Sequence, residues 1–430
     1  MKKIFLLIAL TMSCVLANAQ ENDTLNTKTH VKQNDKNWNQ YNPERGFFQK
    51  AYSDEGDPRF MITNEDETFS FGVGGVLQVI SFYDFMGSLN SKDFSTWNIP
   101  VPTSHTSQYG MTVGSTKINF KSKSKLGRNN LIAFISLNTP SSEDRIKLRQ
   151  AYISWGDVTI GKTYSFFMDL AAGPMTVDLQ GPNTQISLNT PLIGYTRPFG
   201  KWTFAVALEM PKYTVPEDFK EYGIENDFQS SPDFTAHVHY KASFGHLQLG
   251  FLTRRLHYWV SPKDQDVDKS KKCSGDGVSL SGLINITSKC FFTFQGIYGA
   301  GIAQYINDFA DAGIDLVLDE VNNEDPIKNS LKALTTYGGY GSFQYNWNKK
   351  FRSAFIYGLT GVSNVNDLYK NLYKFDLSQY IALNLFYRIN DYCVCGVEYL
   401  HGLRLDFTPN SSDTEYGYAN RLNAMFSYTF

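Results

Sequence analysis

The 430-residue sequence predicts an all-β fold, a transmembrane antiparallel β-barrel of about 16 strands. Three observations predict it. Apolar and polar residues alternate with period two along many segments, short and long connections between these segments alternate, and aromatic residues make up 15% of the chain. Strands that return in pairs through short periplasmic turns and long external loops produce this order of connections.

The first 19 residues are expected to be a signal peptide. Two lysines precede an apolar run over residues 4–16, and Ala17 and Ala19 supply small side chains at the cleavage site. The mature chain is then expected to begin at Gln20. A lipidated Cys14 is the alternative interpretation of this leader.

Residues 20–65 are polar, with little periodicity, and are expected to form a flexible periplasmic N-terminal segment. The barrel is expected to occupy 66–430, where no stretch approaches the roughly 18 to 20 apolar residues that a membrane-spanning helix needs. A sheet in lipid must close on itself because hydrocarbon cannot satisfy backbone hydrogen bonds. The net charge of −2 leaves no cationic field for a nucleic-acid partner.

The first predicted strand shows the alternation, with Phe69, Phe71 and Val73 on one face and Ser70 and Gly72 on the other. An even number of strands places both ends of the barrel on the periplasmic side. A secreted β-sandwich or β-helix is the alternative, but it does not explain the order of connections. The predicted strands are 69–84, 112–124, 131–138, 146–155, 158–166, 187–197, 202–210, 233–240, 246–258, 278–287, 290–304, 333–346, 351–361, 376–388, 393–406 and 416–430.

A barrel of this size leaves an aqueous channel, and the alternation assigns charged side chains to its inner face. Guanidinium groups around a water-filled neck would attract carboxylates. Arg352 and Arg388 fall near the periplasmic rims, however, and an inward arginine can also pair with Glu398 across the wall. The residues expected to line the pore are Arg254, Arg404, Arg421, Arg388, Arg352, Glu209, Asp233 and Glu398.

Several segments carry a resemblance to a known family: 147–152, 161–166 with Asp169, 231–234, 396–404 and 420–423. In these segments the chain after residue 65 resembles the DcaP-like trimeric outer-membrane porins. The resemblance implies a homotrimer of barrels whose inward arginines favour small anions such as dicarboxylates. The 20–65 segment lacks the heptads of the periplasmic coiled coil that some members carry, so no coiled-coil clamp is expected.

The resemblance also concerns the long connection 167–186, which contains Asp169, Pro174 and Asp178. It implies that this segment is a constriction loop that folds into the pore. Length alone does not show this insertion, and an external loop is the alternative.

A second basic group comes from neighbouring early strands: Lys117, Lys121, Lys147 and Arg149. Strict alternation would turn Gln150 outward. Either a β-bulge shifts the register there or this wall faces another subunit, and we expect the trimer contact on it.

The sequence contains no nucleophile elbow, Walker loop or zinc-protease helix, so no catalytic residue and no cofactor is expected. His237 and His239 share a strand face but lack a third metal ligand, and the acidic stretches 264–268 and 319–325 lack the spacing of a calcium loop. No metal is expected. The predicted function is passive diffusion of small hydrophilic solutes through the outer membrane of a Gram-negative-type bacterium, in contact with its lipid. An adhesin, a surface receptor and a lipid hydrolase are the alternatives, although His401 has no placed serine partner.

Overall fold

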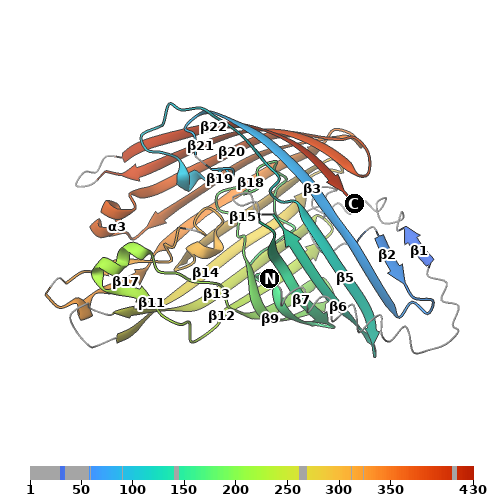
Figure 1. Cartoon of the computed structure of the whole chain (residues 1–430), viewed down its shortest axis with the longest axis horizontal. Helices are drawn as coiled ribbons and strands as arrows, with labels where there is room; N and C mark the ends of the chain where they lie inside the picture. Colours follow the sequence, from blue (N-terminus) through green and yellow to red (C-terminus); the bar gives the residue numbers. More distant parts are fainter. Residues whose placement is uncertain are drawn as a thin grey trace.

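A computed structural model describes residues 30–33, 58, 60–89, 91–139, 145–260, 269–310, 312–322, 324–408 and 414–430. Within them, 16 antiparallel strands form a closed barrel, as predicted, because β22 returns to pair with β3. β4 and β5 together make the second strand, since both pair with β3. Figure 1 shows the tilted strands around the bore. The barrel strands are β3 (Phe69–Met86), β4 (Gln108–Thr112), β5 (Lys117–Leu126), β6 (Asn129–Asn138), β7 (Lys147–Trp155), β8 (Val158–Tyr164), β9 (Asn189–Phe199), β10 (Trp202–Glu209), β12 (Asp233–Ala242), β13 (Gly245–Val260), β14 (Lys269–Asn285), β15 (Cys290–Ala300), β18 (Thr335–Asn346), β19 (Phe351–Ser363), β20 (Phe375–Arg388), β21 (Cys393–Phe407) and β22 (Thr414–Thr429).

Short turns gather at one end of the barrel, where glycine permits the tightest of them. Gly127, Gly156 and Gly200 begin two-residue connections with φ of 65°, 59° and 62°, a left-handed conformation that costs glycine little. The chain also ends here, since Phe430 and Gly75 exchange two backbone hydrogen bonds of 2.9 and 3.0 Å. The start of β3 and the end of β22 therefore lie at the same end, as the even number of strands predicts.

Two short strands precede the barrel, β1 (His30–Gln33) and β2 (Phe60–Thr63). They pair with each other, and β2 also pairs with β3. Both lie beside the short-turn end (Figure 1). The segment predicted to be irregular thus contains regular structure at these two places, while the predicted signal peptide lies outside the described residues.

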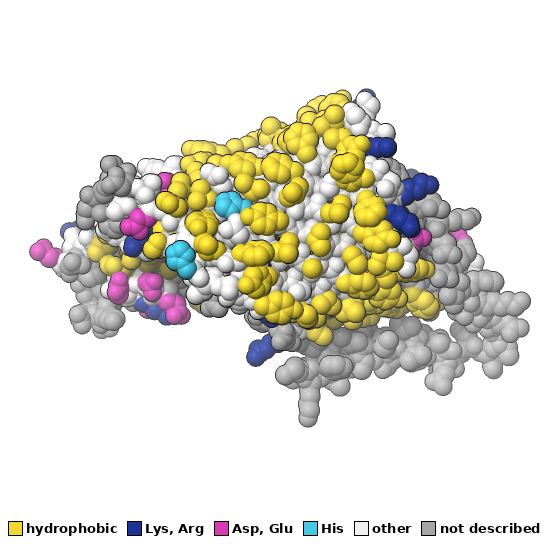
Figure 2. Space-filling view, turned by 90° about the horizontal axis from the view of Figure 1, so that it is seen from above, with side chains coloured by type: hydrophobic (Ala, Val, Ile, Leu, Met, Phe, Trp, Pro, Cys, Tyr) yellow, Lys and Arg dark blue, Asp and Glu magenta, His cyan; other side chains and the backbone are white. Residues whose placement is uncertain are grey.

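The outer surface is apolar. Ile193 and Leu383 expose 58% and 56% of their surface on the outer face of the wall. In Figure 2 hydrophobic side chains form a broad band, and charged side chains gather toward the two ends. Exposed tryptophans, Trp155, Trp202 and Trp347, lie at the short-turn end, where an interfacial aromatic girdle belongs. No helix among the described residues is long and apolar enough to cross a membrane.

The opposite end carries the long connections, three of which enter the bore. We call them L1 (87–107), L3 (165–188) and L6 (301–334). The largest buried apolar cluster joins Phe167 of L3, Tyr305 and Phe309 of L6, and Leu252 on the inner face of β13. The apolar core of this barrel is therefore built by its loops. The remaining elements are η2 (Thr96–Asn98), η3 (Glu217–Tyr222), β11 (Ile224–Asn226), η4 (Ala303–Tyr305), β16 (Leu316–Glu320), η5 (Pro326–Lys328), β17 (Ser330–Ala333) and α3 (Asp367–Leu372).

Candidate functional site

The candidate site is the bore, and L3 lies across it. Gln248 on β13 donates a 3.0 Å hydrogen bond to the Met168 carbonyl, and Asn384 on β20 donates a 2.8 Å bond to the Met175 carbonyl. Between them, Tyr340 on β18 lies 3.3 Å from the Ala172 carbonyl. Inward side chains of well-separated strands thus satisfy the backbone of L3. The loop is inserted, as the resemblance implies, and Pro174 lies within the inserted segment.

Glu398 fastens the middle of L3 to β21. Its carboxylate accepts hydrogen bonds from the backbone N–H groups of Val177 (3.1 Å) and Asp178 (2.6 Å). Asp178 in turn accepts from the Phe94 N–H of L1 at 3.3 Å. Burial raises the pKa of Asp178 well above its usual range, and the charges of Glu398 and Asp93 add to this effect. Glu398 faces inward as predicted, but it binds a loop.

Asp308 of L6 joins all three inserted loops. Its carboxylate accepts from the hydroxyl of Thr96 and from the Trp97 N–H (3.2 Å), both in L1, and from the amide of Gln180 in L3 (3.0 Å). Burial raises the pKa of Asp308 to about 6, although these hydrogen bonds favour its ionised form. A titratable group therefore lies where L1, L3 and L6 meet.

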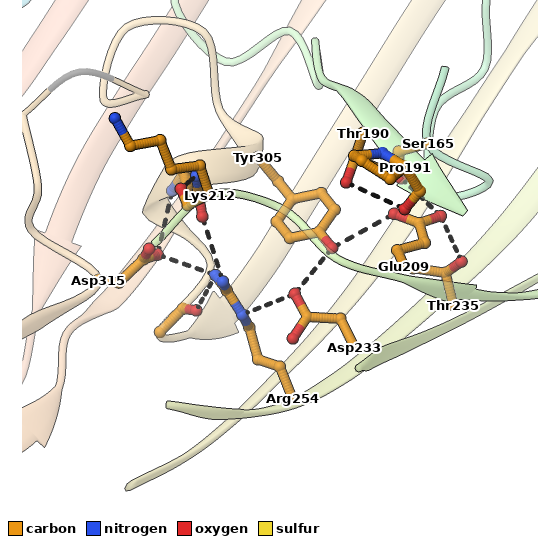
Figure 3. A network of polar contacts seen from close by, with 12 residues as sticks. Ser165, Thr190, Pro191, Glu209, Lys212, Asp233, Thr235, Arg254, Tyr305 and Asp315 are labelled. Atoms are coloured by element: carbon orange, nitrogen blue, oxygen red, sulfur yellow. Dashed lines mark hydrogen bonds and ion pairs between the residues drawn. The ribbon is translucent and has the colours of Figure 1, made fainter. Parts of the chain in front are cut away.

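Arg254 on β13 is buried in a network with two aspartates (Figure 3). Its Nε lies 3.0 Å from Asp233 at the start of β12, and its Nη1 lies 3.2 Å from Asp315 of L6. Only 2% of Arg254 is exposed. Arg254 and Asp233, predicted to line the pore, are paired with each other, and Arg254 also holds Asp315 of L6.

Glu209 at the end of β10 extends this network. It accepts hydrogen bonds from the Thr235 hydroxyl (2.6 Å) and from the Phe166 N–H at the start of L3 (2.8 Å). The Tyr305 hydroxyl lies 3.3 Å from Glu209 and 3.0 Å from Asp233, and so connects the two carboxylates (Figure 3). Glu209, predicted to line the pore, is another loop anchor.

Two further predicted lining residues hold L1. Arg421 is fully buried and binds Asp84 through two contacts of 2.5 and 3.0 Å, while also donating to backbone carbonyls of L1. Arg404 pairs with Asp406 at 2.7 Å and donates to the Trp97 carbonyl of L1. Both arginines face inward as predicted, but neither presents an uncompensated charge to the bore.

The other two arginines lie near the short-turn end, as the sequence suggests. Arg352 donates a 2.8 Å hydrogen bond to Gln344 and stacks over the ring of Phe291 at 4.5 Å. Arg388 forms an ion pair with Asp391 in the next turn. The structure places both at the rim of the barrel.

The early wall contains the β-bulge that the sequence offered as one explanation of Gln150. Ser136 and Leu137 on β6 pair with Gln150 and Leu148 on β7, so Arg149 is the extra residue. Gln150 consequently turns inward and donates a 3.0 Å hydrogen bond to Thr163.

The same register fixes the second basic group. Ile118 is 39% exposed on the outer face, so Lys117 and Lys121 face inward on β5. Arg149 contacts Tyr164, and Lys147 is exposed at the start of β7. Lys117, Asn138 and Lys147 pair in one row across β5, β6 and β7, so Lys147 lies on the same face as Lys117 and Lys121, while Arg149 is the bulged residue and contacts Tyr164.

The histidines on the inner wall bind L3. Nδ1 of His237 lies 2.6 Å from the Phe166 carbonyl, and Nε2 of His246 lies 2.9 Å from Asp169, with His239 stacked on His246. Burial alone would raise the pKa of Asp169, but His246 brings it below its ordinary value. Among the residues that the structure describes, no group of three or more His, Cys, Asp or Glu could hold a metal ion.

The wall sequence matches a family model described as "Porin subfamily" over residues 70–380. The chain belongs to this porin family. It is an outer-membrane channel for passive diffusion in a Gram-negative bacterium, a channel rather than an enzyme. His401, considered above for a hydrolase, lies 2.8 Å from the Asn420 side chain.

Solved porins share this fold. The outer-membrane channel DcaP of Acinetobacter baumannii has a TM-score of 0.69 at 18% identity, covering 86% of this porin and 99% of that chain. The anion-selective porin from Comamonas acidovorans has a TM-score of 0.55 at 9% identity, covering 84% and 100%. Salmonella typhi OmpF in complex with daunomycin has a TM-score of 0.53 at 10% identity, covering 85% and 99%. No curated protein matches the sequence.

Reasoning from the sequence missed L6 and L1 as parts of the site. A signal was present: L6 contains Ile302, Tyr305, Ile306 and Phe309, all of which are fully buried. A purely external loop has no reason to carry four large apolar residues within eight positions.

Proposed function

We propose that this porin favours small anions such as dicarboxylates, and that the cations responsible are lysines of the early wall. One observation carries the proposal: β5 to β8 contain no Asp or Glu, while the inward face of this wall carries Lys117 and Lys121 of β5, each less than a tenth exposed. The inward residues Ser136, Gln150 and Thr163 on β6, β7 and β8 are uncharged, and Lys147 is a further cation on this face. An inner wall of one sign raises the local concentration of the opposite ion.

The arginines elsewhere on the inner wall are matched by carboxylates. Arg254 pairs with Asp233 and Asp315, and Arg421 pairs with Asp84 of β3, the strand next to β5. A guanidinium that is already paired contributes little net field to a passing solute. These arginines are therefore poor candidates for the selectivity.

Planar-bilayer recording of reversal potentials in a KCl gradient tests the proposal. We expect anion selectivity for the wild type and a shift of the reversal potential toward cations in Lys117→Gln/Lys121→Gln. Lys201→Gln, in the short turn between β9 and β10, is the matched control and should behave like the wild type. A disodium succinate gradient should rank the wild type, the double variant and the control in the same order of anion selectivity. Cation selectivity of the wild type, or an unchanged double variant, would contradict the proposal.

We further propose a homotrimer whose contact includes β7 and β8. Ile153 and Ile160 pair across these strands and are each more than half exposed outward, so Ala151 and Lys162, the next pair on that face, also point outward. The Lys162 ammonium donates to the Leu148 carbonyl at 3.0 Å. A lysine at mid-strand on a lipid-facing wall destabilises the folded barrel by about 2 to 4 kcal/mol. Contact with another subunit is therefore more favourable for this face than contact with lipid.

A further inference from the structure

An apolar groove of about 700 Å³ runs along the outer wall over β19 to β22, next to the periplasmic turn 347–350. Its volume lies within the range of about 300 to 1,000 Å³ of small-molecule sites. The side chains that line it include Trp347, Phe351, Leu383, Leu385, Val397 and Tyr399.

The groove has a simple origin in the strand register. Ser353, Leu385, Val397 and Ala424 pair in a row across the four strands. The small side chain of Ser353 at one end of this row leaves a hollow beside larger neighbours such as Phe351. The hollow therefore follows from side-chain size along one row of a regular sheet.

A basic rim borders the groove at the membrane surface. Lys349 and Lys350 are exposed in the turn that also carries Trp347, and Lys289 is exposed in the preceding periplasmic turn. Backbone hydrogen bonds of 2.8 Å from Asn346 to Lys289 and from Arg388 to Lys350 hold the neighbouring turns together. Arg388 is matched by Asp391, so the lysines give this rim its positive charge.

The apolar groove and the basic rim together favour a lipid with an anionic headgroup. Lipid tails are as apolar as leucine, so an acyl chain gains little hydrophobic energy by leaving the bilayer for the groove. Each lysine near a membrane surface instead favours an anionic headgroup by about five-fold, and lysine stems reach along apolar surface while keeping the ammonium in water.

We propose that this surface binds one anionic glycerophospholipid of the periplasmic leaflet. Its phosphate group contacts Lys349 and Lys350, and one acyl chain occupies the groove between Trp347 and Tyr399. Binding here is independent of the bore, since the groove lies on the outward face of the wall.

Native mass spectrometry of the full mature protein in a neutral detergent tests the proposal, with dioleoyl phosphatidylglycerol and dioleoyl phosphatidylethanolamine as probes. We expect the wild type to retain one phosphatidylglycerol with at least about ten-fold preference, and Lys349→Gln/Lys350→Gln to lose that preference. Lys201→Gln, which removes a lysine from a distant periplasmic turn, is the matched control and should retain it. Leu385→Trp fills the groove, leaves the lysines in place and should lower the retention of both lipids.

Every variant must keep the heat-modifiable electrophoretic mobility of a folded barrel. Equal retention of the two lipids by the wild type overturns the proposal. So does an equal loss in Lys201→Gln and in the double variant, because the preference would then reflect net charge. Full retention by Leu385→Trp would show that no acyl chain lies in the groove and would also overturn it.

Discussion

Charged side chains inside this barrel act mainly by holding loops and strands in place. Arg254 and Arg421 are buried, and each forms an ion pair with an aspartate from another element. A buried charge is tolerated only when it is paired and hydrogen-bonded. The inward charged residues predicted from the sequence therefore overstate the net charge that a solute meets in the bore.

The Arg254 network makes a prediction about stability and conductance. Arg254→Met leaves Asp233 and Asp315 buried without a countercharge, and breaking such a pair typically costs about 3 to 5 kcal/mol. We expect L6 to leave its place, so that single-channel conductance rises and limited proteolysis cuts within 301–334. Arg388→Met is the control, because a rim ion pair contributes only about 0 to 1 kcal/mol. A wild-type conductance and cleavage pattern in Arg254→Met would show that the network does not hold L6.

At the scale of elements, the strands form the wall and the loops determine what is inside it. L3 crosses the bore because side chains from β13, β18, β20 and β21 satisfy its backbone groups. L1 and L6 then pack on L3 through Asp308. The inserted loops thus form one connected unit, and releasing one of them would expose buried polar groups of the others.

Asp308 makes this unit sensitive to pH. Its pKa of about 6 in the packed state lies above the ordinary value of 3.8, so the packed state binds the proton more tightly than a state with the loops released. Stability of the packed loops therefore falls as pH rises from about 4 to 6 and is lowest above pH 6, by on the order of 3 kcal/mol. We expect less current flicker at pH 5 than at pH 7.5.

Asp308→Asn imitates the protonated carboxyl group and is the matched variant. Its flicker should be low at both pH values in the same bilayer recordings. If flicker in the wild type increases on acidification, or if Asp308→Asn keeps the pH dependence, another group governs the loops.

At the scale of the whole molecule, the outward face divides into lipid-facing and protein-facing regions. The side of the barrel seen in Figure 2 carries a broad apolar band, but the face formed by β7 and β8 carries Ala151 and Lys162 near mid-strand. Hydrocarbon tolerates the band and disfavours the lysine. This difference in chemistry is the reason for placing the subunit contact there.

Ala151→Trp tests the trimer contact. A large side chain should prevent close approach of a neighbouring subunit, so light scattering of the detergent-solubilised protein should shift from three copies toward one. Val206→Trp, on the outward face of β10, is the control and should leave the mass unchanged. A trimer that survives Ala151→Trp unaltered would move the contact to another part of the wall.

Much of the fold could be predicted because the relevant signal is local. Period-two alternation located the 16 strands of the wall, but the predicted 112–124 missed most of β4 and the break between β4 and β5. The start of β14 at Lys269 lies nine residues before the predicted one, since its Lys, Ser, Cys and Gly residues resemble a loop. The Gln150 anomaly correctly pointed to a bulge. The site was predicted less well, because parity gives the direction of a side chain and not its partner.

The sequence by itself determined the closed sheet, its apolar outer surface and the inward direction of Arg254, Glu209 and Glu398. Each of these follows from a pattern of neighbours one or two positions away. Only the tertiary structure decided that these charges bind loops, since Arg254 and Asp315 are 61 positions apart and meet only when L6 enters the barrel. Electrostatic pairing acts through space, whereas strand periodicity acts along the chain. For this reason the strands could be predicted from the sequence, whereas the partners of the charged residues could be identified only in the structure.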